Sequence, residues 1–551
     1  MDEKCVKAAV LQGRAYVALL QYDKALECYN SAKQMDAGKD AVINEYIERA
    51  RIKQAAQLEE QTAQQTFEAS SETGLARVLE SLVKPDQPII FYIGGLQVIQ
   101  HKLQCGGEAR TLFRSSGGFQ LASSHGEISR CLSCCYPGSL SVADVQLTAV
   151  YLTVLRDACV DNDENQCQLL AMHSLLQQLM KFIESVPLCQ DVALAGVDLL
   201  VYLSRVTARN RSQIVRHCGA IKLLTTAFQL ARRLPTFSLV ATYQRFVCEL
   251  AASDHMRRQL HHGDEFEQSV LDSFNLLLAT DLTVCECSVQ LMVSLCEDNW
   301  LRRRMSVNQA TWSTAVNALK TLVDASLQSN VDLVCTLLTL LANMSISGTS
   351  GAAERDLVEL CGLCTDLVTQ FDSKQLVDVC YLLLSRVLKR SQGAVECVVD
   401  RQLISHLARL GLDCDDDNRL RQCLAVLAAC TLHSDVARRQ LVDSSPPLIR
   451  LLVGVLLSTR DDDLLIGNTA LCLSHCLSVS SAMQQLITAS SHHDLIKTLL
   501  TMARDHGNTA VQHNCAILIG KLVQQHTPFL DRLRQLHGLE ILHTVLRQVQ
   551  H

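Results

Sequence analysis

The chain has 551 residues, of which 48% are hydrophobic and only 4% aromatic, with 24 Gly and 8 Pro. This composition favours helices rich in Leu, Ala and Val over an all-β fold, and the length exceeds that of one compact core. The net charge of -7 arises from acidic and basic residues mixed along the chain, which excludes a basic field for nucleic acid. The apolar stretches are too short to cross a bilayer and the amino terminus lacks a signal-peptide core. We therefore expect a cytoplasmic protein without nucleic-acid or membrane partners.

Residues 5–38 have the pattern of one tetratricopeptide repeat, a pair of packed helices, and resemble that family. Gly13 is expected to let the two helices approach each other. The second helix should pack through its small and aromatic residues, Ala25, Tyr29 and Ala32. Because one repeat is only marginally stable alone, we expect it to be the last of a truncated set. An apolar face would then be exposed at Val10, Leu11 and Val17.

Lys7 is the candidate partner-binding residue of this repeat. Tetratricopeptide modules that hold the acidic tails of cytosolic chaperones grip the carboxylates with a Lys and, four residues on, an Arg. Lys7 stands at the first of these positions, but Leu11 stands at the second. A solvated surface charge is therefore the competing interpretation of Lys7.

Two segments follow the repeat before the regular pattern begins. Residues 40–72 are rich in Glu, Gln, Ala and Arg and contain no Gly or Pro, which predicts a polar linker helix. Residues 105–127 contain paired glycines and serines and are predicted to form a loop. Long loops in repeat arrays often lie on a binding face, so a functional loop stays an open alternative.

The remaining chain repeats itself with a period of about 45 residues, the length of an armadillo or HEAT unit. In each copy a basic or polar helix end runs into an apolar helix. The copies begin at Asn165, Asn210, Met256, Leu301, Ala353, Ala394, Ala437, Met483 and Arg532. A second, more apolar helix type lies between copies, as in residues 329–345. Residues suited to N-caps precede several of these helices, at Asp281, Asp417, Asp462 and Asn508.

These repeats resemble the armadillo family, in which a short helix is followed by two longer ones and the third lines a groove. The resemblance implies an all-α, right-handed α-α superhelix of armadillo/HEAT type, preceded by a partial tetratricopeptide module. We expect a tetratricopeptide repeat over 5–38, a linker helix over 40–72 and a solenoid over 75–551. Such an extended surface binds other proteins and offers no closed pocket for a small-molecule substrate.

The armadillo resemblance also predicts where a partner is contacted. In peptide-binding members, the third helix carries an Asn that holds the ligand backbone. The corresponding positions are Tyr202, Glu249, Ser294, Asn343, Arg386, Thr431, His475 and Lys521. Only Asn343 keeps the family residue, which favours a groove specialised for one partner over general capture of basic peptides. We predict protein contacts at Asn343, Arg386, His475 and Lys521, in addition to Lys7.

Motifs for catalysis or nucleotide binding are absent from the sequence, among them GxxxxGK[ST], GxGxxG, HExxH and GxSxG. The pairs Cys131/Cys134 and Cys361/Cys364 have CxxC spacing, but neither has a second pair nearby to complete a zinc site. Buried reduced thiols are the favoured interpretation. We expect no enzyme, no metal and no cofactor.

The order of parts narrows the resemblance further. A tetratricopeptide repeat, a Gln/Glu-rich helix, the phrases KPDQPIIFYIGGLQVI and IGNTALCLSHCLSV, and armadillo units occur together. This order is similar to that of tetratricopeptide–armadillo proteins that assemble axonemal dynein arms. The resemblance implies a non-catalytic cytoplasmic scaffold for motile cilia, with dynein chains, assembly factors or chaperone machinery as partners. The competing hypothesis is an armadillo-type adaptor that reads linear peptides for transport or junctional partners.

Overall fold

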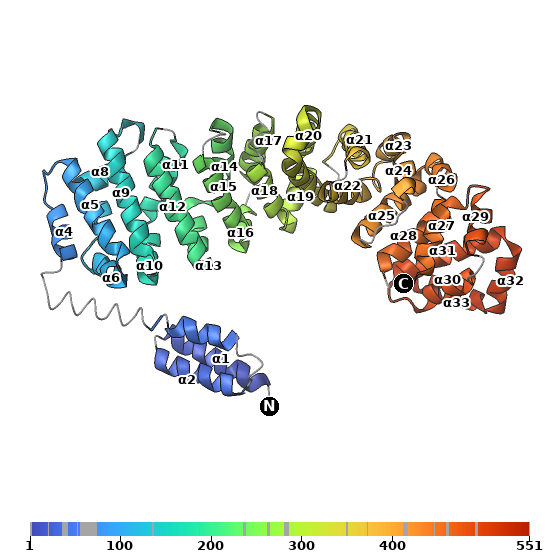
Figure 1. The fold of residues 1–551 in the computed structure, drawn as a ribbon, viewed down its shortest axis with the longest axis horizontal. Helices are drawn as coiled ribbons and strands as arrows, with labels where there is room; N and C mark the ends of the chain where they lie inside the picture. Colours follow the sequence, from blue (N-terminus) through green and yellow to red (C-terminus); the bar gives the residue numbers. More distant parts are fainter. Residues whose placement is uncertain are drawn as a thin grey trace. The chain divides into compact units, whose positions relative to one another are not determined.

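The fold is known from a computed structural model, and every regular element in the residues it describes is helical. The described residues are 3–19, 21–35, 42–51, 53–54, 74–134, 137–186, 188–234, 238–261, 265–279, 286–348, 351–371, 373–410, 417–445, 447–458, 462–490 and 494–549. The predicted all-α fold is confirmed (Figure 1). None of the described helices combines the length and hydropathy that a membrane crossing requires.

The helices pack into two compact units, which are described separately. Unit 1 comprises Met1–Thr226 and Phe237–Met256, and unit 2 comprises Ala227–Thr236 and Arg257–His551. This division does not test the predicted boundaries at 5–38, 40–72 and 75–551, which stay a prediction. Residues 55–73, the larger part of the predicted linker helix, lie outside the described residues.

Unit 1 begins with the helices of the tetratricopeptide-like segment and continues into the first repeats. Its helices are α1 (Glu3–Ala18), α2 (Tyr22–Met35), α4 (Gly74–Leu82), α5 (Ile89–Gln104), α6 (Gly107–Ser115), α7 (Leu121–Ser124), α8 (Gly126–Leu132), α9 (Val142–Cys159), α10 (Asp163–Leu170), α11 (His173–Glu184), α12 (Gln190–Val206), α13 (Ala208–Cys218) and α15 (Ser238–Ala251). A 3-10 turn covers Pro137–Ser139. Two further helices, α14 (Ala220–Arg233) and α16 (Asp254–Leu260), contribute residues to both units.

Unit 2 holds the later repeats. After the parts of α14 and α16 that belong to it, a π-helical turn covers Phe266–Leu271. The helices that follow are α17 (Asp272–Leu278), α18 (Glu286–Leu295), α19 (Asn299–Val307), α20 (Gln309–Ile346), α21 (Glu354–Gln370), α22 (Lys374–Val387), α23 (Gln392–Asp400), α24 (Leu403–Leu410), α25 (Asp417–His433), α26 (Asp435–Val442), α27 (Leu448–Leu457), α28 (Asp463–Cys476), α29 (Ala482–Ala489), α30 (Leu495–Asp505), α31 (Thr509–Gln525), α32 (Thr527–Gln535) and α33 (Gly538–Val549).

The two helices α1 and α2 pack as the tetratricopeptide pattern predicts, with helical residues 42–51 completing a small core. A Cβ atom at Gly13 would lie 2.4 Å from the Tyr29 ring, so the predicted close approach at Gly13 is confirmed. The predicted apolar face is smaller than expected. Leu11 is 61% exposed, whereas Val10 and Val17 pack partly against the core.

A short helix followed by two longer helices forms the repeated unit, as in α10, α11 and α12 or in α26, α27 and α28. We call the last member of each triplet the third helix. Third helices pack on one another in chain order, α9 on α12 and α12 on α15 in unit 1, and α18, α20, α22, α25, α28 and α31 in unit 2 (Figure 1). Each repeat therefore buries its apolar side chains against its neighbours, which is the source of stability in a solenoid.

The helix α20 departs from the triplet pattern. It runs without interruption from Gln309 to Ile346 and so combines the second and third helices of its repeat. The sequence over this span contains neither Gly nor Pro, so no residue in it is a strong helix breaker. Its carboxyl end still occupies the place of a third helix, because it packs on α18 and α22.

Two of the four predicted N-caps are confirmed. The Asp462 carboxylate accepts hydrogen bonds from the amides of Leu464 and Leu465, at 3.0 Å each, and the Asn508 side chain accepts one from the Ala510 amide at 2.9 Å. Asp417 is instead the first residue of α25, so the helix begins one residue earlier than an N-cap at Asp417 would imply. A carboxylate in the first turn is favoured there by the positive end of the helix dipole. Asp281 lies outside the described residues.

The predicted loop at 105–127 is wrong, because this segment contains α6, α7 and the start of α8. Gly106 and Gly107 stand at the start of α6, and Gly117 and Gly118 follow its carboxyl end. Gly117 has a φ of +80°, and the Gly118 amide donates to the Phe113 carbonyl at 2.8 Å. A Cβ atom at Gly118 would lie 2.4 Å from the buried Phe113 ring. Gly117 and Gly118 therefore allow the chain to turn tightly after α6 and to pack against the buried Phe113. The glycines of this segment no longer support a functional loop.

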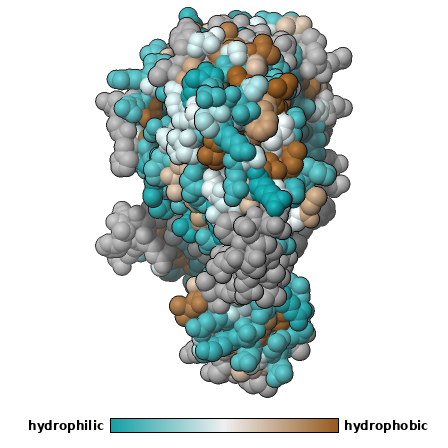
Figure 2. Space-filling model, turned by 90° about the vertical axis from the view of Figure 1, so that its left-hand side faces the viewer, coloured by the Kyte–Doolittle hydropathy of each residue, from teal (hydrophilic) through white to brown (hydrophobic). Residues whose placement is uncertain are grey.

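Exposed hydrophobic side chains occur on the first solenoid helices of unit 1. Val83, Ile90, Phe91 and Val98 are all exposed, Ile90 most strongly at 77%. In Figure 2 the hydrophobic surface on the side of the molecule that it shows is scattered among hydrophilic side chains. Scattered apolar residues are ordinary on a protein surface and do not define a binding face.

Candidate protein-interaction surface

The positions predicted from the armadillo resemblance share one place in the fold. Each lies in the last turns of a third helix, close to its carboxyl end. Tyr202 and Glu249 belong to unit 1, and the other six, Ser294, Asn343, Arg386, Thr431, His475 and Lys521, belong to unit 2. We call these eight positions the third-helix row. The stacking of third helices repeats this position once in every repeat.

Several side chains of the third-helix row reach back to the third helix before them. The Arg386 guanidinium donates to the carbonyl oxygen of Ala342, and the Lys521 ammonium donates to the carbonyl oxygen of Ser474 at 2.9 Å. The Tyr202 hydroxyl donates to the Cys159 carbonyl at 3.3 Å. Carbonyl groups at a helix end lack helical partners and carry partial negative charge, which a cation or donor stabilises. Sequence reasoning missed this structural role of the row.

Other members of the row pair with each other, with a neighbouring third helix or within their own helix. The Thr431 hydroxyl lies 3.1 Å from His475 Nδ1, and Glu249 forms an ion pair with Arg205 at 2.9 Å. Ser294 donates to the Gln290 carbonyl of its own helix at 3.1 Å. The row is therefore a chain of contacts between or within repeats, and these contacts use part of its hydrogen-bonding capacity.

His475 is neutral at physiological pH. Burial, together with the positive charges of Lys521, Arg438 and His433, lowers the pKa of His475 to about 4. Burial is the largest cause of this low pKa, and the three cations add to it.

Asn343 differs from its counterparts in the row. Its side chain is half-buried in α20, and within the described part of the chain no hydrogen bond to its amide is found. An amide with unused donors and acceptors can bind the backbone of an extended ligand. The predicted contact at Asn343 stays a prediction that this geometry permits.

Lys7 lies on the exposed surface of α1, far in sequence from the row. Leu11, one helical turn further on, is 61% exposed. The second position of the carboxylate grip therefore presents an apolar side chain to solvent, and the role of Lys7 in partner binding stays a prediction.

A hollow of about 470 Å³ adjoins the row in unit 2 and includes Arg386. We call it the basic hollow. It is formed by the carboxyl ends of α20 and α22 and the amino-terminal halves of α25 and α28. Its lining residues are Ser345, Ile346, Leu382, Ser385, Arg386, Lys389, Arg390, Arg421, Gln422, Ala425, Leu464 and Asn468. Four of these are cations, and no acidic residue of the described chain lines the hollow.

The charges of the basic hollow are only partly compensated. Arg421 Nε lies 2.5 Å from Asp462 Oδ2, and Asp462 is the N-cap of α28. Burial acts to raise the pKa of Asp462, but the Leu465 amide and Arg421 together hold that pKa below its usual value. Burial and the nearby Arg302 lower the pKa of Arg386. Lys389 and Arg390 are exposed and have no carboxylate partner among the described residues.

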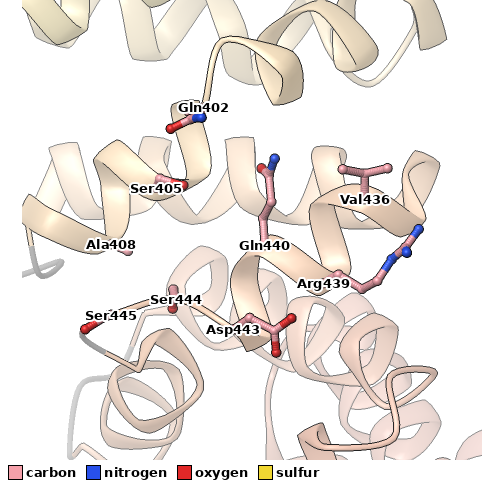
Figure 3. A pocket seen from close by; sticks show the side chains of 9 residues that line it. All are labelled: Gln402, Ser405, Ala408, Val436, Arg439, Gln440, Asp443, Ser444 and Ser445. Atoms are coloured by element: carbon pink, nitrogen blue, oxygen red, sulfur yellow. The ribbon is translucent and has the colours of Figure 1, made fainter.

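A second hollow, of about 640 Å³, lies between α24 and α26 (Figure 3). Arg439 of α26 and Asp443, the C-cap of that helix, both line it, so its opposite charges cancel. Gln440 Nε2 donates to the Val399 carbonyl at 3.3 Å, and Gln485 repeats this contact with Val442 at 3.0 Å in the next repeat. The glutamine therefore joins successive repeats. No residue of the third-helix row lines this hollow, and the basic hollow is the stronger candidate.

The cysteines predicted as a weak zinc candidate are free thiols in the structure. Burial and Asp144 raise the pKa of Cys131 to about 12, and burial raises that of Cys361 well above its usual value. A protonated thiol is a poor nucleophile and a poor metal ligand. In the described ranges, no group of three or more His, Cys, Asp or Glu side chains could hold a metal ion.

Triplets of helices with stacked third helices define an armadillo-type all-α solenoid, a class of repeat-built protein-interaction scaffolds. A solved structure described as "A conserved phosphorylation switch controls the interaction between cadherin and beta-catenin in vitro and in vivo" matches 95% of this chain and 98% of its own, with a TM-score of 0.53 and 13% identity. That likeness shows the fold alone. No family model matches the chain.

The particular resemblance is to tetratricopeptide repeat protein 12. The chain is 28% identical to that protein from Mus musculus over 566 residues and 27% identical to that from Homo sapiens over 570 residues. Each comparison covers 100% of this chain and 76% of the relative. The resemblance inferred from the order of parts is thereby confirmed along the full chain.

Proposed function

We propose that this protein is a non-catalytic cytoplasmic scaffold that assists the assembly of axonemal dynein arms in motile cilia. The observation that carries the proposal is the similarity to tetratricopeptide repeat protein 12 along all of this chain and 76% of that protein, which includes the tetratricopeptide-like segment as well as the solenoid. The order of these parts is the feature that resembles dynein-arm assembly factors. Dynein chains, co-assembly factors or chaperone machinery are the proposed partners.

The third-helix row is the proposed contact face for these partners. Asn343, Arg386, His475 and Lys521 occupy the same place on four third helices of unit 2, and Lys7 adds a cation on α1. A scaffold needs to hold a long partner segment at several points without changing it chemically. Recurrent side chains at the ends of stacked helices are suited to that task, because weak contacts add up along a linked segment.

Multiciliated cells that lack the protein provide the test. The proposal predicts cilia deficient in dynein arms, restored by the wild-type chain, and proximity labelling of dynein chains or assembly factors in the cytoplasm. Electron microscopy of axonemal cross-sections measures the arms. Normal inner and outer arms in cells without the protein would overturn the proposal.

A second candidate function is an adaptor that reads linear peptides for transport or junctional partners. The observation that favours it is Asn343, whose amide has no hydrogen-bond partner among the described residues. This alternative predicts that short extended peptides bind and that Asn343→Ala weakens them. Fluorescence anisotropy with a panel of basic and acidic peptides measures this, and no binding to any of them removes the alternative.

A further inference from the structure

We infer that the basic hollow binds an acidic, extended segment of a protein partner. The inference rests on the proposed scaffold function and adds the chemistry of the segment that the scaffold holds. It places that segment across α20, α22, α25 and α28, all within unit 2.

The charge of the hollow selects an anionic ligand. Arg386, Lys389, Arg390 and Arg421 converge on it, and Asp462 compensates only Arg421. Bringing several like charges together is unfavourable, and burial, together with the nearby Arg302, lowers the pKa of Arg386. A carboxylate entering the hollow relieves the repulsion and gains charge-assisted hydrogen bonds from guanidinium groups. Each such pair is weak when exposed, so binding requires several carboxylates at once.

The remaining lining fits a peptide. Ile346 of α20 and Leu464 of α28, which are 45% and 60% exposed, line the hollow from its first and last helices in chain order and offer apolar contacts. Ser385 donates to Gln422 at 2.8 Å, which joins the polar floor between α22 and α25. Four neighbouring helices at roughly 9–10 Å spacing span about 30 Å, the length of about nine extended residues. An extended segment with several Asp or Glu and an apolar residue at each end meets these features.

A nucleic acid is a poorer occupant of the hollow. The lining contains no aromatic side chain on which a base could stack. The chain as a whole carries a net charge of -7, which opposes a polyanion at longer range. A short acidic segment experiences the local cations more strongly than this distant field, because salt screens charges beyond about 8–10 Å.

The test uses the full chain and a fluorescent peptide of about nine residues that contains several Glu with a Leu near each end. The control peptide has Gln in place of every Glu. Fluorescence anisotropy at low ionic strength should show that the Glu peptide binds at least about tenfold more tightly than the Gln peptide, and that added salt weakens it. Equal binding of the two peptides would overturn the inference.

Charge variants locate the peptide on the chain. Lys389→Glu with Arg390→Glu reverses two exposed charges that have no carboxylate partner among the described residues, so the fold should persist. This double variant should weaken the Glu peptide about tenfold or more. The matched control is Arg450→Glu, which alters an exposed cation on α27 outside the hollow. An equal loss in both proteins would show non-specific attraction and overturn the inference.

A variant that binds the Glu peptide more tightly provides a further test, because higher affinity cannot result from misfolding. Asp462→Asn removes the charge that compensates Arg421, while Asn serves as well as Asp at an N-cap. This variant should bind the Glu peptide about threefold more tightly with an unchanged helical circular dichroism spectrum. Unchanged or weaker binding by the folded variant would contradict a role for Arg421.

A competition experiment tests the choice of a protein ligand. If oligodeoxythymidine displaces the labelled Glu peptide at a lower concentration than the unlabelled Glu peptide does, that choice is overturned.

Failure of this inference and failure of the proposed function are distinguishable. If dynein arms require the protein but the hollow variants restore them fully and bind the peptide normally, the basic hollow is not the site and only the inference is overturned. If cilia lacking the protein have normal arms, the proposed function is overturned even when the peptide binds in the hollow.

Discussion

His475 illustrates how one side chain in the third-helix row depends on neighbours from other helices. Its Nδ1 lies 3.1 Å from the Thr431 hydroxyl on α25, and Lys521 on α31 contributes to its low pKa. The sequence indicated a polar residue at this position but could not indicate its charge state. That charge state depends on burial and on the cations Lys521, Arg438 and His433, which lie on other helices.

The low pKa of His475 makes the stability of unit 2 sensitive to moderate acid. The unfolded chain has the usual histidine pKa of 6.5, whereas the folded pKa is about 4. Between these values the unfolded state binds more protons, so stability falls as pH decreases from 6.5 to 4, by at most about 3 kcal/mol. His475→Asn should remove most of this slope. Hydrogen exchange of α28 amides at several pH values measures it, and an identical slope in the variant would contradict the assignment.

Asp144 in unit 1 should respond to stronger acid. It lies at the third position of α9 in a capping box with Ser141 and contacts Arg130 at 2.5 Å. Burial acts to raise its pKa, but Arg130 and Ser141 outweigh this and lower it to about 2. Stability from this carboxylate is present above the usual pKa of 3.8 and is lost as pH falls toward 2, amounting to about 2 kcal/mol. Exchange of α9 amides in wild type and Asp144→Asn measures this. A variant that loses protection in the same pH window as wild type would contradict it.

At the scale of the helix, periodicity predicted the elements better than turn residues predicted their ends. The apolar spacing correctly indicated third helices such as α28 and α31, because each must bury a stripe against neighbours. The glycines at 117 and 118 were misread as a loop, because a sequence does not reveal that Phe113 occupies the space beside them. Asp417 was predicted to be an N-cap but is the first residue of α25, because an aspartate is favourable both at the N-cap and in the first turn of a helix.

Two glycines in unit 2 should respond oppositely to the same substitution. A Cβ atom at Gly351 would lie 2.3 Å from the backbone carbon of Val307, whereas one at Gly454 in α27 would meet nothing within 4 Å. Gly351→Ala should therefore destabilise the unit by about 1–3 kcal/mol. Gly454→Ala should stabilise it by about 0.5–1 kcal/mol, because alanine is the better helix former. Urea unfolding followed by circular dichroism compares them, and a loss of stability in both variants would count against this packing.

The repeat period of the chain predicted the armadillo-type solenoid, because stacking imposes the same apolar pattern on every repeat. The position of the third-helix row also followed from the family pattern. The basic hollow did not, because its lining residues are drawn from four helices and cover more than a hundred positions of the chain. A site assembled from distant helices has no local sequence motif by which it could be predicted. Only Arg386 was common to the predicted contacts and the observed hollow.

The central claim is that partners bind along the third helices, and photo-crosslinking in multiciliated cells tests it most directly. A photoreactive amino acid is placed at Asn343 or Lys389, and in a matched protein at Arg450 on α27. The account predicts that the first two positions capture dynein chains or assembly factors and that the third does not. Crosslinks to the same partners from Arg450 alone, or equally from all three positions, would contradict it.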